Sequence, residues 1–234
     1  MRNVISTSVL GASSRRRAEG DSLRSKAYRQ IKEMIILAEL PPASLIDEAQ
    51  LVSDLKVGFT PVRQALQWLA LENLVVILPR RGTIVADLNA SDLQKIYEMR
   101  IQLVPHAVRL AAERATDREI ASMGALLDRS DAVIAKGDHY QLIRLDRQFQ
   151  RLLTAATHNE FLIEMLDQLY SHSLRLWYAN LHRIRGLRQE IRDHRKILSA
   201  LKAHDGKRAE AIMRSTVAEF HREQMSLNQN LSRS

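Results

Sequence analysis

The apolar pattern of residues 51–86 changes from a helical period to a strand period, and this change limits the possible folds more than any other feature. Residues 51–55 carry apolar side chains at helical spacing, and Lys56-Val57-Gly58-Phe59 forms a tight connection. A second helix is predicted to open at Thr60-Pro61. Thr60 can cap the first turn, and proline suits that turn because its missing N–H has no intrahelical partner there.

The second helix is predicted to be amphipathic and to be followed by a hairpin. Four apolar side chains share one face: Val62, Ala65, Leu66 and Leu69. Three polar side chains lie away from it: Arg63, Gln64 and Gln67. After Asn73 the period becomes two, which predicts strands over Val75–Leu78 and Thr83–Ala86. Pro79-Arg80-Arg81-Gly82 joins them, with glycine where a turn requires positive φ.

Two helices joined by a tight turn and followed by a basic-tipped hairpin describe a winged helix-turn-helix. Such a unit places one helix in the major groove of DNA and the hairpin against the neighbouring backbone or minor groove. The pattern therefore predicts a double-stranded DNA partner.

The distribution of charge supports a polyanionic partner. The chain has 234 residues, enough for two domains, and a net charge of +8. Residues 1–32 hold eight Lys or Arg against two acids, whereas residues 33–54 hold five acids and no base. The absence of cysteine excludes disulfides, zinc–thiolate sites and a cysteine nucleophile, and it permits a reducing, cytoplasmic compartment. No apolar run approaches the ~18 residues of a membrane span, so no membrane partner is expected.

The chain divides into four predicted segments. Residues 1–21 form a flexible basic arm, either a solvated tail or, through Arg15–Arg17, a phosphate or minor-groove contact. Residues 22–88 form the winged helix-turn-helix domain. Residues 89–228 form a helical domain for effector binding and dimerisation, and residues 229–234 form a frayed tail.

The predicted fold class is mainly α, with the winged unit followed by an all-α antiparallel bundle. A first helix over residues 23–38 is stopped by Pro41-Pro42. Thr116-Asp-Arg-Glu119 is a capping box that opens a later helix. Six helices with short connections are predicted for the bundle: 91–114, 117–136, 139–157, 160–183, 187–203 and 207–227.

Polar residues interrupt the apolar stripes of four bundle helices. They are Arg100, Asp146, Gln150, His194 and Thr216. Burying one unpaired polar group costs roughly 1–3 kcal/mol, so five that face one interior indicate a polar cavity. Each alone has a simpler interpretation: Asp146 as the partner of Arg100, His194 as a satisfied core histidine, and Thr216 as plain packing. Trp177, Tyr178 and Arg175 supply either a wall and a cationic anchor for this cavity or ordinary core and surface.

Residues 55–66 resemble the signature LGVSRTPVREAL of the GntR superfamily of bacterial transcription regulators, in the branch with an FCD (FadR-type C-terminal) domain. The resemblance covers about residues 23–225. Thr60-Pro61-Val62-Arg63 and the wing Arg81-Gly82 match well, whereas Gly58 and Phe59 replace the family's Ser and Arg. Because that Ser and Arg touch the operator in the family, the resemblance implies a different base preference here.

The resemblance also implies roles for the residues of the winged unit. Arg63 would reach a guanine edge or a phosphate, Thr60 and the turn amides would hold phosphates, and Lys56 would restore a phosphate contact. The predicted DNA-binding set is Lys56, Thr60, Arg63, Gln64, Arg80, Arg81 and Gly82.

Many FCD domains hold a divalent metal with one Asp and three His. The matching positions here are Asp146, Gln150, His194 and Thr216, so only Asp146 and His194 remain as metal ligands. Amide and hydroxyl oxygens are poor substitutes for imidazoles. We therefore expect no cofactor and no tightly bound metal, and an organic effector bound directly in the bundle. Arg100, Arg175 and His194 could anchor a carboxylate, with Asp146, Gln150 and Thr216 around it.

The resemblance implies a ligand-responsive transcription regulator, more often a repressor, that binds a two-fold operator as a homodimer. Two other functions stay open at this point. A helical adaptor could use its winged domain to bind protein, since folds are reused in that way. An enzyme could use Asp146, Gln150 and His194 as the remnant of a hydrolytic metal centre, although no nucleophile motif or phosphate loop is present.

Overall fold

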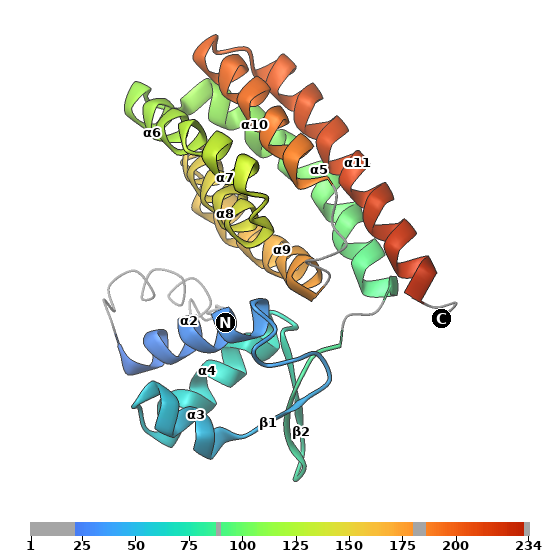
Figure 1. Cartoon of the computed structure of the whole chain (residues 1–234). Helices are drawn as coiled ribbons and strands as arrows, with labels where there is room; N and C mark the ends of the chain where they lie inside the picture. Colours follow the sequence, from blue (N-terminus) through green and yellow to red (C-terminus); the bar gives the residue numbers. More distant parts are fainter. Residues whose placement is uncertain (1–21, 88–89, 180–185, 232–234) are drawn as a thin grey trace, which may run out of the picture. The chain divides into compact units, whose positions relative to one another are not determined.

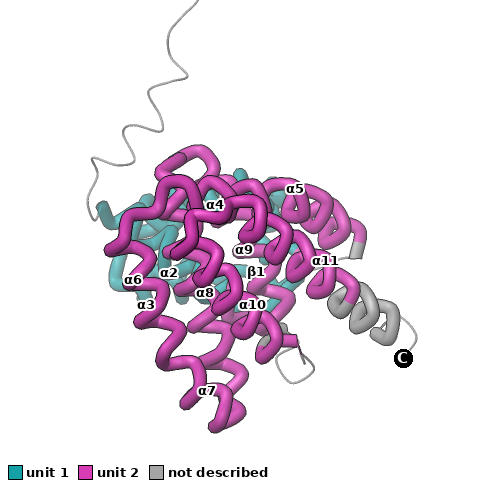
Figure 2. The backbone as a smooth tube through the Cα atoms, turned by 90° about the horizontal axis from the view of Figure 1, so that it is seen from above, with its two compact units in different colours: residues 1–35, 39–86 teal, residues 36–38, 87–234 magenta. Residues whose placement is uncertain are grey.

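The computed structural model of the chain describes residues 22–87, 90–179 and 186–231 (Figure 1). The chain divides into two compact units, coloured separately in Figure 2: residues 1–35 with 39–86, and residues 36–38 with 87–234. We call them unit 1 and unit 2 and describe each by itself. The predicted basic arm over residues 1–21 lies outside the described residues.

The described part of unit 1 contains three helices: α2 (Leu23–Ile36, whose last residue is assigned to unit 2), α3 (Glu48–Leu55) and α4 (Phe59–Leu71). Asp47 caps α3, because its side chain accepts hydrogen bonds from the backbone N–H groups of Ala49 and Gln50. At the other end Lys56 adopts a left-handed φ of 53°, which turns the chain from α3 towards α4.

Two details of this region correct the predictions. The helix predicted over residues 23–38 ends at Ile36, and Ala38 has a left-handed φ of 58° that no α-helix can contain. Thr60 does not cap α4: the N-cap is Gly58, no side-chain hydrogen bond caps this end, and Thr60 is already helical. Pro61 lies in the first turn of α4, as its missing N–H requires.

The wing is an antiparallel sheet with the strand order β1–β3–β2. Its strands are β1 (Leu45–Ile46), β2 (Val75–Leu78) and β3 (Gly82–Val85). The hairpin pairs Val75 with Val85, close to the prediction. Strand β1 was not predicted, because two residues that pair Leu45 with Ile84 are too short to show a period. The core of unit 1 lies between the helices and one face of this sheet.

Unit 2 is a bundle of helices (Figure 1). Its helices are α5 (Ala90–Arg114), α6 (Asp117–Asp128), α7 (Ser130–Lys136), α8 (His139–Ala155), α9 (Glu160–Ala179), α10 (Leu187–Lys202) and α11 (Gly206–Leu231). Helix α5 runs antiparallel beside α11, and α8 packs against α6, α9 and α10. The core gathers around Phe149 and Trp177, both fully buried. The predicted fold class, mainly α with an antiparallel helical bundle, is therefore confirmed.

Two of the helices predicted in unit 2 differ by more than two residues from those observed. The helix predicted over residues 117–136 is two helices, α6 and α7, and at the break the Leu127 carbonyl accepts from Ser130 Oγ and from Arg195 of α10. The capping box at Thr116 is present as predicted. Helix α11 continues to Leu231, so residues 229–231 are helical rather than frayed. The predicted end of the 160–183 helix lies outside the described residues beyond Ala179.

Candidate functional site

Helix α4 buries its apolar face and leaves its polar face exposed. Val62, Ala65 and Leu69 have no exposed surface, because they pack against the core of unit 1. On the other face, the side chain of Arg63 is 66% exposed, and Gln64 beside it is also exposed. Within unit 1, the predicted recognition helix is therefore open to a partner on the side that carries its polar residues.

Arg63 is held by two neighbours. Its Nε donates a hydrogen bond to Oε2 of Glu48 on α3, over 2.7 Å. Its guanidinium carbon lies 5.8 Å from the centre of the Phe59 ring, one turn earlier on α4. These two contacts hold the Arg63 side chain between the carboxylate of Glu48 and the ring of Phe59.

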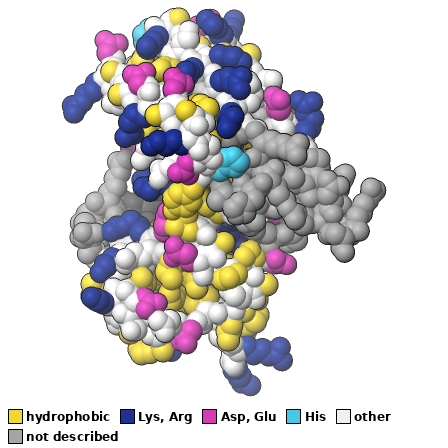
Figure 3. Space-filling model, in the orientation of Figure 1, with side chains coloured by type: hydrophobic (Ala, Val, Ile, Leu, Met, Phe, Trp, Pro, Cys, Tyr) yellow, Lys and Arg dark blue, Asp and Glu magenta, His cyan; other side chains and the backbone are white. Residues whose placement is uncertain are grey.

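The turn and the wing of unit 1 carry further exposed cations. Lys56 is exposed at the turn between α3 and α4. Arg80 and Arg81 are exposed at the tip of the β2–β3 hairpin, where Lys and Arg side chains project from the surface (Figure 3). Gly82 has a φ of 96°, a backbone conformation that other residues rarely adopt. All seven predicted DNA-binding residues are exposed, on the helix-turn-helix and wing of one unit.

In unit 2, a buried hydrogen-bond network centres on Asp146 of α8. Oδ1 of Asp146 lies 2.6 Å from Nε2 of His194 on α10. Oδ2 accepts a hydrogen bond from the hydroxyl of Tyr170 on α9. Burial, followed by the negative charge of Asp146, raises the pKa of Tyr170 well above its usual range, so the hydroxyl keeps its proton and donates. Asp146 thus joins three helices of the bundle.

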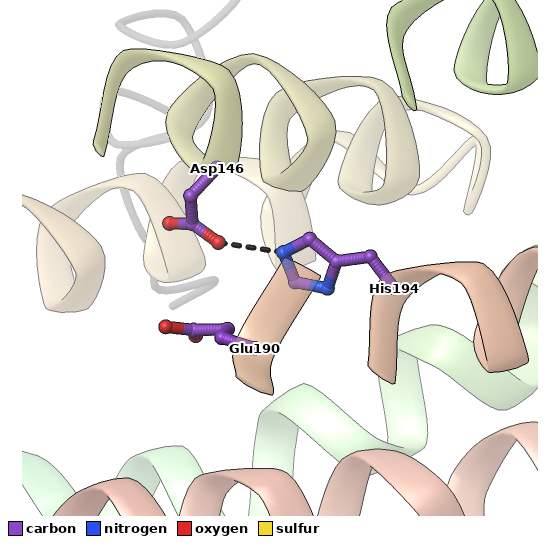
Figure 4. Close-up of side chains that lie close together, drawn as sticks. All are labelled: Asp146, Glu190 and His194. Atoms are coloured by element: carbon purple, nitrogen blue, oxygen red, sulfur yellow. Dashed lines mark hydrogen bonds and ion pairs between the residues drawn. The ribbon is translucent and has the colours of Figure 1, made fainter. Parts of the chain in front are cut away.

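Glu190 is a member of this cluster that the sequence analysis missed. It lies one turn before His194 on α10 and is buried (Figure 4). One ligand atom each of Asp146, Glu190 and His194 lie within 4.8 Å of one another. The signal that could have found it is the spacing of four residues from His194, which puts the two side chains on one side of a helix.

His194 is oriented by stacking. Its ring lies 4.2 Å from the Phe149 ring at an angle of 15°, and it is fully buried. Among the described residues Nδ1 of His194 has no hydrogen-bond partner, although Nε2 is engaged by Asp146. A buried imidazole nitrogen without a partner costs free energy, so this atom is available to a ligand group.

The two predicted cationic anchors have different environments. Arg100 is buried on α5, where Nη1 donates to Ser173 Oγ and the guanidinium lies 5.4 Å from the Tyr170 ring, beside the Asp146 network. Arg175 follows Tyr170 by five residues, a spacing that corresponds to a rotation of ~140° around α9. The two side chains therefore leave α9 on different sides. Burial lowers the pKa of Arg175 to about 10, and the negative charge of Asp87 opposes that shift.

The remaining predicted residues lie at the edge of the cluster. The single hydroxyl proton of Thr216 is shared between the Ile212 carbonyl of its own helix, 3.0 Å away, and Oδ2 of Asp193, 3.3 Å away. Glu190, Asp193 and Thr216 line a cavity of about 50 Å³ between α10 and α11. That volume holds one or two water molecules, since each occupies roughly 30 Å³ in the liquid. Gln150 is buried on α8, one turn after Asp146. Trp177 is a core residue, and Tyr178 is half-buried.

The sequences of the winged unit and of the helical bundle each match a known protein domain. Residues 23–85 match the bacterial regulatory proteins of the gntR family, and residues 95–219 match the FCD domain. The chain belongs to the GntR family. It is a transcription regulator of the GntR type with an FCD domain, and the family is one of DNA-binding regulators rather than enzymes.

Relatives of the GntR family resemble this chain over most of its length. The uncharacterized regulator YdhC of Bacillus subtilis is 30% identical over 83% of this chain and 86% of its own. The transcriptional repressor GlaR of Escherichia coli is 26% identical over 80% of this chain and 89% of its own. The solved structure of E. coli McbR covers 89% of this chain and all of its own, with a TM-score of 0.80 and 25% identity. None of the described helices is long and apolar enough to cross a membrane.

Of the Asp-His₃ metal set that the family resemblance implies, this chain keeps only Asp146 and His194. Both carboxylate oxygens of Asp146 already take part in hydrogen bonds, with Tyr170 and His194. The hydroxyl of Thr216 is directed to the Ile212 carbonyl and to Asp193. The nearby Glu190 makes the local set two carboxylates and one imidazole, which is poorer in nitrogen than zinc and nickel prefer.

Proposed function

We propose that this GntR-type regulator is a repressor that binds a two-fold operator and is controlled by a small carboxylate. The exposed face of α4, flanked by Lys56 and the arginine-tipped wing, is the observation that carries the DNA-binding part. The repressor part is supported by the relative GlaR, whose name states that activity.

The operator half-site would be read mainly through α4. Arg63 and Gln64 lie on the exposed face and can reach base edges in the major groove. Thr60 and Lys56 lie at the start of the helix and in the turn, where a hydroxyl and an ammonium can hold phosphates. Arg80 and Arg81 at the hairpin tip would follow the minor groove or the adjacent backbone.

A homodimer would present two such surfaces to a two-fold operator. Helix-turn-helix dimers read half-sites about one helical turn, ~34–36 Å, apart. The bundle in unit 2 would supply both the dimer interface and the ligand site, because the winged unit is occupied with DNA.

The ligand site would be the buried network around Asp146 and His194. Arg100 supplies a positive charge beside Tyr170, and Nδ1 of His194 supplies a ring nitrogen that needs a partner. A carboxylate would pair with the Arg100 guanidinium, and it would accept a hydrogen bond from Nδ1 when the His194 ring carries both protons; it needs no metal. Arg175 leaves α9 on another side and is therefore a weaker candidate as an anchor.

The cavity between α10 and α11 adjoins this network, and its lining includes Glu190 but neither Arg100 nor His194. A volume of about 50 Å³ is well below the roughly 300–1,000 Å³ of ligand pockets. A metabolite would therefore bind to a more open arrangement of α10 and α11 and would shift the population towards it. Only such a difference in affinity between two arrangements can change operator binding.

The experiment begins with duplexes selected from the source genome by the full chain. Small mono- and dicarboxylates are then titrated into the complex, and release of DNA is followed by fluorescence anisotropy. A ligand that releases DNA should bind Arg100→Ala and His194→Ala at least tenfold more weakly in calorimetry. The control variant Arg144→Ala removes an exposed arginine of α8 and should bind normally. Unchanged affinity in both test variants rejects the anchors, and absence of any DNA binding at low salt favours the adaptor.

A further inference from the structure

The recognition helix begins with an exposed aromatic residue. Phe59 is the first residue of α4 and is 47% exposed, although a phenylalanine is among the residue types most often buried. It lies one turn before Arg63, so the two side chains share the outward face. Water-exposed apolar area at a binding surface gains free energy when a partner covers it.

The ion pair with Glu48 determines how Arg63 is presented. The pair uses Nε of Arg63, the guanidinium nitrogen nearest the side-chain stem. The Nη1–Nη2 edge lies at the end of the guanidinium farthest from the side-chain stem. This edge is the one that can form two parallel hydrogen bonds with O6 and N7 of guanine.

We propose that Phe59 and Arg63 read neighbouring base pairs as one element, and that Glu48 is the positioning residue. Arg63 binds a guanine through Nη1 and Nη2, and the Phe59 ring packs on the 5-methyl group of a thymine. This inference rests on the proposed function, because it requires α4 to enter the major groove of an operator.

The chemistry of the ring favours a thymine methyl over a phosphate. A phenyl ring has no hydrogen-bond donor for a phosphate oxygen, whereas apolar contact with the thymine methyl is an established way to read that base. Four residues advance about 6 Å along an α-helix, and successive bases are about 3.4 Å apart. The thymine is therefore expected one or two base steps from the guanine.

The first test removes only the methyl group. Duplexes are selected by the full chain from a random pool, and each thymine of the best duplex is replaced in turn by deoxyuridine. We expect one position in each half-site to lose about fourfold in affinity, the value of one buried methyl group. Replacing that thymine by deoxyuridine should change the affinity of the Phe59→Ala variant less than twofold. In the Phe59→Leu variant the replacement should still lower the affinity, but less than in the parent chain. Circular dichroism melting checks that these exposed-site variants fold normally.

The second test concerns Glu48. Glu48→Gln should reduce the preference for guanine over adenine at the Arg63 position at least fivefold, without weakening binding to unrelated duplex. The matched control Asp54→Asn removes the same charge from an exposed position of α3 and should keep that preference. A purely structural role for Glu48 would lower both kinds of binding together.

The outcomes separate this inference from the proposed function. A selected operator without any methyl-sensitive thymine, or with equal loss in Phe59→Ala, overturns the reading by Phe59. A normal guanine preference in Glu48→Gln overturns the positioning role. Selection that enriches no sequence at all overturns the proposed function itself.

Discussion

Oδ1 of Asp146 lies 2.6 Å from Nε2 of His194, and both side chains are buried in the interior of the helical bundle. The contact ties α8 to α10, and the Tyr170 hydroxyl adds α9 through the other oxygen of Asp146. Because a buried charge is costly unless it is paired and hydrogen-bonded, this network both stabilises the bundle and keeps polar groups at its centre.

Replacement of Asp146 by alanine should destabilise unit 2 strongly. Removing one partner of a buried pair typically costs about 3–5 kcal/mol, since the other partner is left without compensation. Here both His194 and Tyr170 would lose their partner. Urea unfolding followed by circular dichroism gives the free energy of unfolding. Asp128→Ala, at an exposed position of α6, is the control and should change it by less than about 0.5 kcal/mol. A loss below about 1 kcal/mol for Asp146→Ala would contradict the network.

A metal site should appear when the two missing histidines are supplied. The double variant Gln150→His, Thr216→His restores an Asp-His₃ set at the positions that match the family. We expect it to hold one zinc or nickel ion per chain after dialysis, with a higher melting temperature when metal is added. The parent chain should hold no stoichiometric metal in elemental analysis. A stoichiometric metal in the parent would show that Glu190, Gln150 or Thr216 ligates better than we propose.

The capping box of α6 should make stability depend on acidic pH. The backbone N–H of Thr116, followed by the hydrogen bond with His158, lowers the pKa of Glu119 from 4.5 to about 2. A lowered folded-state pKa means that the contribution is complete above pH 4.5 and disappears as pH falls towards 2. Glu119→Gln should cost about 0.5–1 kcal/mol at pH 7, since the partly exposed carboxylate is screened by solvent.

Urea unfolding of both proteins between pH 3 and 7 checks this dependence. The difference in unfolding free energy should be constant above about pH 5 and should shrink below it. A difference that grows on acidification would refute the assigned shift.

The native Lys56 is expected to lower the stability of unit 1 and to raise its affinity for DNA. Its left-handed φ of 53° is strained for a residue with a Cβ, and glycine adopts it freely. Lys56→Gly should therefore raise the unfolding free energy of unit 1 by up to about 1 kcal/mol. Loss of the cation should weaken DNA binding and reduce the slope of log K against log salt by about 0.9. Equal salt slopes for parent and variant would remove Lys56 from the interface.

The elements with a long, regular apolar period could be predicted from the sequence. The winged unit followed these rules, because the apolar face of α4 and the pairing of Val75 with Val85 are local patterns. The break at Arg129 was not predicted, because neither proline nor glycine marks it; there the Leu127 carbonyl accepts from Ser130 Oγ and from Arg195 of α10. The N-cap of α4 was predicted at the wrong residue. Thr60 has a suitable side chain, but the turn places Gly58 at the N-cap.

The site was predictable only in part. Asp146 and His194 were found because polar residues on apolar stripes are visible in a sequence, and the structure joins them directly. Tyr170 and Glu190 were missed, because an aromatic residue on a stripe looks like core and a glutamate near a helix start looks like a solvated charge. The cavity volume also depends on how side chains pack, which no period reveals.

The binding of Arg63→Ala to a selected operator duplex tests the central claim most directly. Titration by fluorescence anisotropy at fixed salt should show a loss of about 1–3 kcal/mol, or 5- to 150-fold, against the parent chain. Binding to unrelated duplex should change much less, and the melting temperature should not change. Operator affinity equal to that of the parent, or a parent that prefers no duplex sequence, would contradict the account of α4 as the DNA-reading helix.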